Sequence, residues 1–298
     1  VTQVETITVT NLVTGATGKI GSDIDSNSSS FDYYAESVSL NSDGTIFAVG
    51  SPGDDQSGSN AGMVQVYQRD TNAAIGWSQL GGDILGEAGG NSLPYPNSFA
   101  GDQSGWAISL SSDGLTLAIG GKYNNGNNSN YANGNSYEGH VRVYQYSGGS
   151  WDKLGDDIDG EYAGDYTGYP NQISLNDNGT IVAIGSTKNP GSSGQNGTGH
   201  VRVYQRNASN TTVVPYGWTK LGDDIDGEGP TGEDFGGAVS LNGDGTVLAV
   251  GAYRAERPDD NEGYVSIYQY INSSWSKLND IIGEANDDYL GRTVSLSS

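Results

Sequence analysis

The sequence contains no cysteine, and only 13 of its 298 residues are lysine or arginine, against 36 aspartate and glutamate residues. Without cysteine, disulfides, zinc–thiolate sites and cysteine nucleophiles are excluded. The net charge of -23 argues against nucleic acid and anionic membranes as partners, because both require a basic surface. No stretch approaches the roughly 18 apolar residues of a membrane-spanning helix, so direct insertion into a membrane is not expected.

The chain does contain a fourfold repeat. Each copy begins with Val/Ile-Ser-Leu, continues through a short β-rich run to glycine, and then reaches a Val-x-Val-Tyr-Gln segment or a close relative, followed by a tryptophan. The equivalent leucines are Leu40, Leu110, Leu175 and Leu241, which lie 70, 65 and 66 residues apart. A self-similar unit of this length with four predicted strands is typical of a propeller blade. We therefore predict an all-β propeller with four-stranded blades at approximately residues 35–84, 105–158, 170–225 and 237–282.

The two ends of the chain resemble parts of one further blade. Ile7–Ile20 aligns without a gap on Val141–Leu154, which predicts the last two strands of a blade, and Thr293–Ser298 repeats the first strand. Joining residues 1–24 to residues 290–298 would close a single five-bladed domain over residues 1–298 and remove the open sheet edges. The alternative is a partial chain of a six- or seven-bladed propeller.

The segment Phe235–Gly245, together with Gly251-Ala252, resembles the FG-GAP repeat of integrin-α-type propellers, and Val49–Asp55 resembles the other end of that repeat. The resemblance extends through all four blades. It implies extracellular adhesion and ligand binding, often with calcium in the blades. The calcium loop of that family needs a series of Asp or Asn oxygens, but Ser240 and Leu248 stand at two of those positions. We therefore interpret the Asp-Gly steps as hairpin turns.

Carboxylates recur between the predicted blades. Two runs of alternating acids could converge on a hard cation such as Ca²⁺, so the candidate metal ligands are Asp157, Asp159, Glu161, Asp224, Asp226 and Glu228. A second series, Asp102, Asp165, Asp234 and Asp288, precedes the first strands. Repetition in every blade favours a loop-fixing role, in which aspartate accepts backbone N–H bonds. No cofactor is therefore required, with Ca²⁺ as the alternative. His140 and His200 share one repeat position and are interpreted as structural.

The connections between strands two and three and between successive blades share one face of a four-stranded blade. The longest connection between strands two and three, residues 121–139, is crowded with Asn and Tyr, and Trp106 breaks the repeat near the innermost strand. Variable loops on a rigid scaffold often carry recognition. The candidate binding residues are Tyr123, Tyr131, Tyr137, Trp106, Asp54, Asp55, Asp259 and Asp260.

Seven Asn-x-Ser/Thr sequons permit a secreted glycoprotein, at Asn27, Asn127, Asn178, Asn196, Asn207, Asn210 and Asn272. We expect a non-catalytic, extracellular or cell-surface module with a structural or adhesive role. Its long-loop face would contact a protein or glycan partner, or further copies in a larger assembly. The first alternative is a calcium- or glycan-binding, lectin-like propeller. The second is a carbohydrate-active enzyme that uses Asp and Glu, which would need two carboxylates facing each other, and no unique pair stands out.

Overall fold

The computed structural model describes residues 6–7, 10–11, 18–19, 21–25, 32–87, 101–125, 137–190, 197–229, 232–256 and 261–297. Throughout these ranges the regular elements are β-strands. The same ranges contain no helix that is long and apolar enough to cross a membrane.

The strands form four blades, each an antiparallel sheet in chain order. Blade one contains β5 (Ser37–Leu40), β6 (Ile46–Ser51), β7 (Met63–Arg69), β8 (Trp77–Gln79) and β9 (Ile84–Leu85). Blade two contains β10 (Ser104–Leu110), β11 (Thr116–Gly121), β12 (His140–Ser147), β13 (Ser150–Lys153) and β14 (Ile158–Asp159). Blade three contains β15 (Ile173–Leu175), β16 (Ile181–Ser186), β17 (His200–Arg206), β18 (Trp218–Lys220) and β19 (Ile225–Asp226). Blade four contains β20 (Ala238–Leu241), β21 (Val247–Ala252), β22 (Tyr264–Ile271) and β23 (Ser274–Ile282).

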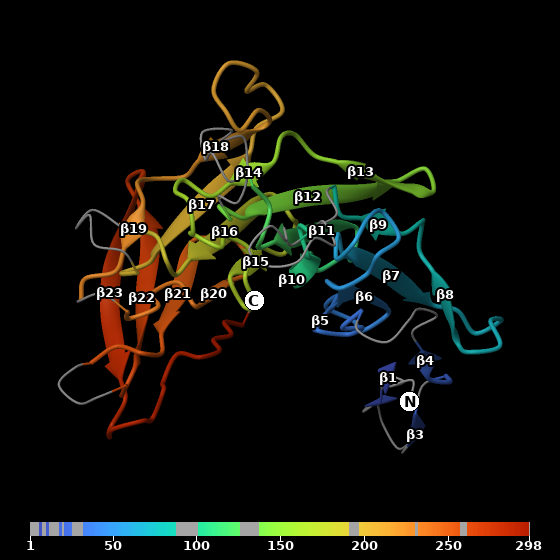
Figure 1. Ribbon diagram of the computed structural model, residues 1–298, viewed down its shortest axis with the longest axis horizontal. Coiled ribbons are helices and arrows are strands. Elements are labelled where there is room, and N and C mark those ends of the chain that lie inside the picture. Colours follow the sequence, from blue (N-terminus) through green and yellow to red (C-terminus); the bar gives the residue numbers. More distant parts are fainter. Residues whose placement is uncertain are drawn as a thin grey trace.

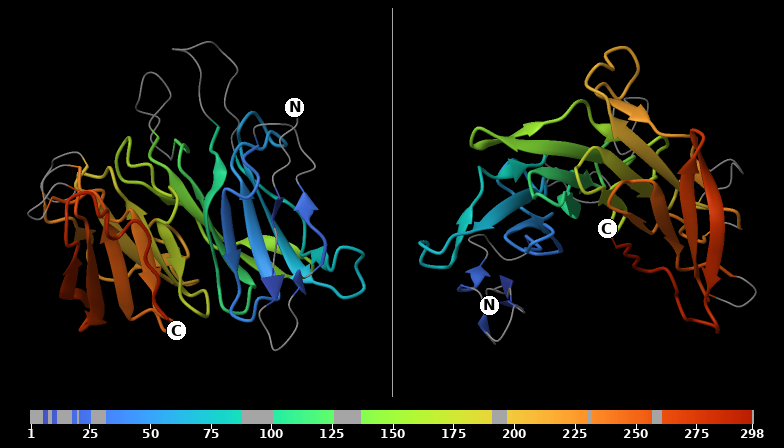
Figure 2. Two further views of the ribbon diagram at one scale, coloured as in Figure 1. Left: turned by 90° about the horizontal axis from the view of Figure 1, so that it is seen from below. Right: turned by 180° about the vertical axis from the view of Figure 1, so that it is seen from behind.

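The blades fan around a central axis, with β5, β10, β15 and β20 innermost (Figure 1). The outermost position is divided in blades one to three, where two short strands pair in succession with the third strand. In blade four, β23 runs continuously through a bulge. The sheets stand side by side and face one another across the inter-blade space (Figure 2).

The Asp-Gly steps are hairpin turns, as the sequence predicts. Gly44 has a φ of 69°, and the Asp43 Oδ1 atom accepts the amide of Thr45 at 2.9 Å. Asp244 makes the same bond to Thr246 in blade four. Bonds from the Thr45 hydroxyl and amide hold the pKa of Asp43 below its usual value. These carboxylates are therefore engaged by their own turns.

Two repeated contacts join each blade to the next. Trp151, Trp218 and Trp275 each donate an indole N–H to a leucine carbonyl of the preceding blade at 2.7–2.8 Å. The glycine one residue before the end of the second strand meets a glycine of the segment that follows the blade, and a Cβ on Gly185 would lie 2.0 Å from the Gly236 oxygen. Apolar side chains fill the space between these contacts. The core therefore lies between the blades.

The end segments repeat some of the strand pairings and contacts of the blades. At the N-terminal end, β1 (Thr6–Ile7) pairs with β4 (Ile24–Asp25) and β2 (Thr10–Asn11) pairs with β3 (Gly18–Lys19), as β12 pairs with β14 and β13. At the other end, the Leu296 amide donates to the Ser240 hydroxyl, a bond that Leu241 makes to Ser174 one blade earlier. The all-β propeller is confirmed, and five blades are consistent with it. The strand pairs of the described ranges do not include one between the two ends.

Candidate functional site

Aromatic rings surround the ammonium group of Lys122, directly after β11. The Nζ atom lies 3.5 Å from the ring centroid of Trp106, 4.6 Å from that of Tyr123 and 4.8 Å from that of Tyr169. The rings of Trp106 and Tyr169 are nearly parallel, with an interplanar angle of 7° and centroids 6.1 Å apart. Cations are attracted to the faces of aromatic rings. We call Lys122 and these three rings the Lys122 cage.

Further tyrosines extend the Lys122 cage over the same face. The ring of Tyr123 lies 5.2 Å from that of Tyr137 and 5.8 Å from that of Tyr166. The site therefore combines the innermost strand of blade two, its long loop, and the connection into blade three. The structure brings together three of the predicted binding residues, Trp106, Tyr123 and Tyr137.

Sequence reasoning missed Tyr166, Tyr169 and Lys122. A signal for two of them is present, because Tyr166 and Tyr169 lie before strand β15 where blade two has Gln103 and Trp106. Trp106 is fixed in place by donating its indole N–H to the Gln103 side chain at 2.6 Å. Aromatic side chains of two neighbouring blades thus meet at the Lys122 cage.

Burial controls the charge of Lys122, whose side chain is 5% exposed. Burial lowers the pKa of Lys122 from 10.5 to about 8, and the nearby Glu36 carboxylate opposes this effect. Burial likewise raises the pKa values of Tyr123 and Tyr137. The site therefore holds an amine that can be neutral or protonated at mildly basic pH.

A cavity of about 300 Å³ adjoins Trp106 on the propeller axis. Its walls come from the inner strands of all four blades and the C-terminal segment, including Glu36, Asn171 and Thr293. The rings of Tyr33 and Tyr169 are 47% and 45% exposed, and Tyr33 lies 6.3 Å from Trp106. This cavity, which we call the channel, therefore lies beside exposed aromatic residues and has the Glu36 carboxylate in its wall.

Asp54 and Asp55, which the sequence also predicts as binding residues, do not join this site. The Asp54 Oδ1 atom accepts the Gln56 amide at 2.8 Å, and Asp55 accepts the Asn60 amide at 2.7 Å. Asp54 is buried and both carboxylates hold the β6–β7 loop. Tyr131, Asp259 and Asp260 lie outside the described residues.

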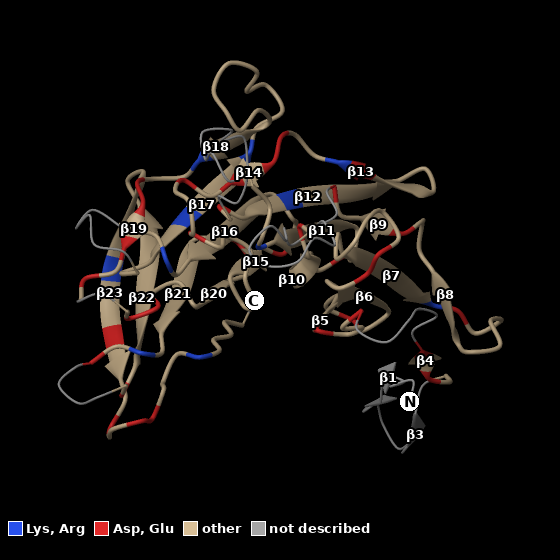
Figure 3. Cartoon of the chain, in the orientation of Figure 1, with Lys and Arg blue, Asp and Glu red and all other residues tan. Residues whose placement is uncertain are grey.

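The six predicted metal ligands do not all converge on one point, because the two ends of an acidic run face different blade junctions. Asp157 contacts Lys153 of its own blade at 2.7 Å, whereas Glu161 turns toward Arg202 of the next blade at 3.6 Å. The reason is geometric: Asp157 precedes β14 and Glu161 follows it, where the chain crosses between blades. Asp224 pairs with Lys220 and also lies close to Glu161, since one carboxylate oxygen of each is within 4.8 Å of the other and of a ring nitrogen of His200. Glu228 pairs with Lys277, and the backbone of Asp159 and Asp226 pairs with β12 and β17. Figure 3 shows basic residues of β12, β13, β17 and β23 near acidic ones.

The second acidic series fixes loops, which confirms the interpretation. Asp165 Oδ2 accepts the amides of Glu161 and Tyr162, each at 2.9 Å, and Asp102 and Asp288 make equivalent bonds. In blade four this position belongs to Glu233, which accepts the Gly229 amide at 3.1 Å, and the expected Asp234 lies one residue later. These carboxylates cap the connection into the next blade.

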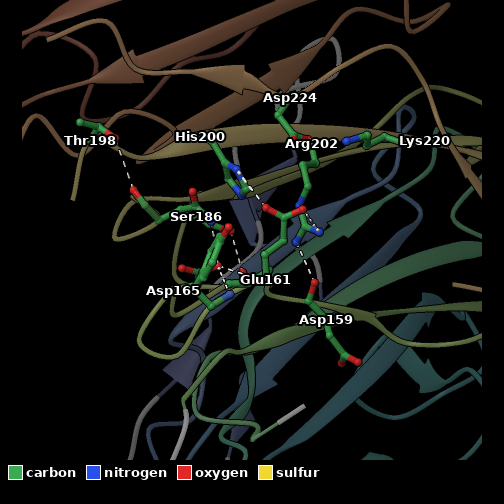
Figure 4. A network of polar contacts seen from close by, with 12 residues as sticks. Asp159, Glu161, Asp165, Ser186, Thr198, His200, Arg202, Lys220 and Asp224 are labelled. Atoms are coloured by element: carbon green, nitrogen blue, oxygen red, sulfur yellow. Dashed lines mark hydrogen bonds and ion pairs between the residues drawn. The ribbon is translucent and has the colours of Figure 1, made fainter. Parts of the chain in front are cut away.

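Each of the two histidines lies among carboxylates, and Figure 4 shows the surroundings of His200. His200 is 1% exposed, and its Nδ1 atom is 3.8 Å from Glu161. Burial and the charge of Arg202 lower the pKa of His200 to about 3, so its imidazole is neutral. His140 is 1% exposed and 3.6 Å from Asp157. Although burial acts to raise the pKa of Asp157, His140 and Lys153 hold it well below its usual range.

Four of the seven sequons lie in described residues. Asn178 caps the first hairpin of blade three, and Asn272 lies in the β22–β23 turn with a φ of 52°. The side-chain amide of Asn207 donates to the Thr219 hydroxyl at 3.0 Å, and the side-chain amide of Asn210 donates to the carbonyl of Val213 at 2.7 Å. Asn27, Asn127 and Asn196 lie outside the described residues.

No family model matches the chain, and no curated protein matches it. Among solved structures, hydrazine synthase of Kuenenia stuttgartiensis is 12% identical, with a TM-score of 0.47. The match covers 87% of this chain and 64% of that one. The periplasmic gluconolactonase PpgL of Pseudomonas aeruginosa is 13% identical, with a TM-score of 0.48, and the match covers 93% of this chain and 68% of that one.

The comparisons contradict the expected non-catalytic, structural or adhesive role. None of them supports it, and both similar structures carry the names of enzymes, a hydrazine synthase and a gluconolactonase. The adhesive role came from the FG-GAP resemblance, which the comparisons match only at the level of the propeller fold. Likenesses of this size leave the activity to be inferred from the site itself.

Proposed function

We propose that the protein binds a carbohydrate at the channel mouth beside the Lys122 cage. The observation that carries the proposal is the parallel pair of Trp106 and Tyr169, with Tyr33 next to Trp106, whose side chain also lines the cavity. Contiguous exposed apolar side chains on a folded chain mark ligand-binding surfaces. Ligand pockets are typically lined by aromatic side chains with a few polar groups that fix orientation.

Carbohydrate chemistry fits both kinds of group. A sugar ring presents C–H faces that pack against aromatic rings, and its hydroxyls require hydrogen-bond partners. Here the ring faces come from Trp106, Tyr33 and Tyr169, and the polar groups are the Glu36 carboxylate and the Asn171 amide of the channel wall. Tyrosine also combines an apolar body with a hydroxyl.

A carbohydrate-active enzyme is the second candidate, and one observation favours it. The Lys122 amine has a pKa of about 8, which is suited to accepting a proton near neutral pH. Perturbed groups in a cleft are typical of catalytic sites. A catalyst would show turnover of sugar esters or lactones that is lost in Lys122→Met, whereas a lectin would show binding without turnover.

The binding proposal is tested with an oligosaccharide panel and isothermal titration calorimetry. Removing one stacked ring costs about 1 kcal/mol beyond lost contact area, so Trp106→Ala and Tyr169→Ala should each weaken binding about tenfold. The control is Tyr162→Ala, because Tyr162 is 55% exposed and lies outside the cluster. Equal affinity in parent, Trp106→Ala and Tyr169→Ala would contradict the proposal. We further propose an extracellular location, where glycans are accessible.

A further inference from the structure

Two equivalent clusters of one histidine and two carboxylates lie at successive blade junctions. Glu87, His140 and Asp157 form the first, between blades one and two, and Glu161, His200 and Asp224 form the second, between blades two and three. In each cluster, one nitrogen or oxygen atom of each residue lies within 4.8 Å of the corresponding atoms of the others. The clusters are separate from the Lys122 cage.

The spacing within the clusters is that of metal ligands. His140 Nδ1 lies 3.6 Å from Asp157 Oδ2, and His200 Nδ1 lies 3.8 Å from Glu161 Oε2. Both separations are too long for a hydrogen bond. Two ligands placed 2.0–2.2 Å from one tetrahedral ion stand about 3.4 Å apart, so small movements would close the geometry.

Both histidines have an unpaired ring nitrogen within the described ranges, and in His140 one such nitrogen faces the cluster. Each is 1% exposed, and over the described ranges the buried Nε2 atom of each ring has no hydrogen-bond partner. The Nδ1 atom of His140, which faces Asp157, also has none there. Its Nε2 atom packs against Gly121, where a Cβ would come within 2.7 Å, so Nδ1 is the nitrogen available to the carboxylates. Buried polar atoms without partners are rare in folded proteins.

Neighbouring cations orient the carboxylates and leave the required oxygens facing the histidines. Lys153 contacts Asp157 at Oδ1, while His140 faces Oδ2. Arg202 contacts Glu161 at Oε1, while His200 faces Oε2. Partners of this kind, which hold a ligand in position, are typical of metal sites.

We propose that each cluster binds one divalent first-row transition metal ion, such as Zn²⁺, through the imidazole Nδ1 and two carboxylate oxygens. Imidazole with carboxylate is a donor set for this class of ion, whereas Ca²⁺ prefers oxygen ligands alone. Three protein ligands leave a position for water. A groove of about 1160 Å³ lined by Glu161 and Arg202 gives an ion access to the second cluster. Each ion joins a glutamate of one blade to the histidine and aspartate of the next.

The repeat supplies its own control substitutions. Blade one has Met63 and blade four has Tyr264 where blades two and three have histidine, and both side chains are buried. The fold therefore accepts a thioether or a phenol at this position. His140→Tyr and His200→Met remove the imidazole with side chains that the propeller already uses.

The test begins with full-length protein treated with EDTA and then titrated with Zn²⁺ or Co²⁺. We expect two tightly held ions per chain by elemental analysis after gel filtration, one in each single variant and none in the double variant. Bound Co²⁺ should show the visible absorption of a low-symmetry, nitrogen-containing site. Zn²⁺ should raise the melting temperature of the parent by several degrees and leave that of the double variant unchanged, because only the binding state is stabilised.

Absence of uptake by the parent, or uptake of two ions by the double variant, would overturn the proposal. So would saturation by Ca²⁺ at concentrations where Zn²⁺ does not bind. Circular dichroism checks that each variant is folded. If His140→Tyr does not fold, Asp157→Asn replaces it, since the amide keeps the shape of the carboxylate, and one bound ion is again expected. Two ions bound by a folded Asp157→Asn variant would count against the first site.

Discussion

Lys122 should make the free energy of unfolding rise with pH in mildly basic solution. Its pKa is about 8 in the folded chain, whereas a solvated lysine titrates near 10.4. Between these values the unfolded chain binds more protons than the folded chain, so stability increases with pH. Below about pH 8 both states are protonated and the cost of the buried charge is fully present. Above about pH 10.5 both states are neutral and the cost is gone.

The size of the effect follows from the same two pKa values. Their difference converts to about 3 kcal/mol, and solvent near the channel mouth reduces this to about 1–2 kcal/mol. Lys122→Met fills similar space without the charge. It should be more stable than the parent by about that amount near pH 7, and this advantage should shrink by about pH 9.5, before the tyrosines titrate.

Urea denaturation of parent and variant at the two pH values measures the change. Lys153→Met is the matched control, because Asp157 raises the pKa of Lys153 and moves its titration above the tested range. The stability difference between the parent and this control should be the same at both pH values. A Lys122→Met advantage that is absent, or equal at both pH values, would refute the argument that burial suppresses this charge.

Two further predictions concern packing between the blades. Trp218→Ala should cost about 3–5 kcal/mol, because the indole is 1% exposed, and Trp275→Ala at the half-buried equivalent position should cost less. Equal costs in urea denaturation would show that burial does not set the difference. Gly185→Ala would place a Cβ 2.0 Å from the Gly236 oxygen and should sharply lower the melting temperature, whereas Gly82→Ala, with open space around it, should not. Similar melting temperatures would show that the blades can separate to admit a side chain.

The blades could be predicted because their signals are local. Alternation within a strand and the Asp-Gly turns fix each hairpin over a few residues, and the repeat multiplies the evidence. Trp106 could be singled out because it departs from the repeat, and Tyr123 because it lies in a long loop rich in Asn and Tyr. Lys122 could not, because the rings that bury it come from different strands and from a neighbouring blade. Contacts of this kind appear only when the blades are placed side by side.

The two histidine clusters could not be predicted from the sequence. Because His140 and His200 share one repeat position, the sequence indicated a structural role for both. The acidic residues recur in the blades as well, so the sequence did not show which of them lie beside the histidines. Each cluster takes one glutamate from the preceding blade, so no run of sequence contains it. The run from Asp157 to Glu161 suggested one site, but its two ends face different junctions.

The central claim, carbohydrate binding at the channel mouth, is tested most directly by ¹⁹F NMR of protein labelled with 5-fluorotryptophan. The chain has five tryptophans, and the Trp106 resonance can be assigned from its loss in Trp106→Phe. On titration with a bound oligosaccharide, this resonance should shift while those of Trp77, Trp151, Trp218 and Trp275 stay in place. An unmoved Trp106 resonance at saturation, or a shift confined to the other four tryptophans, would contradict the account.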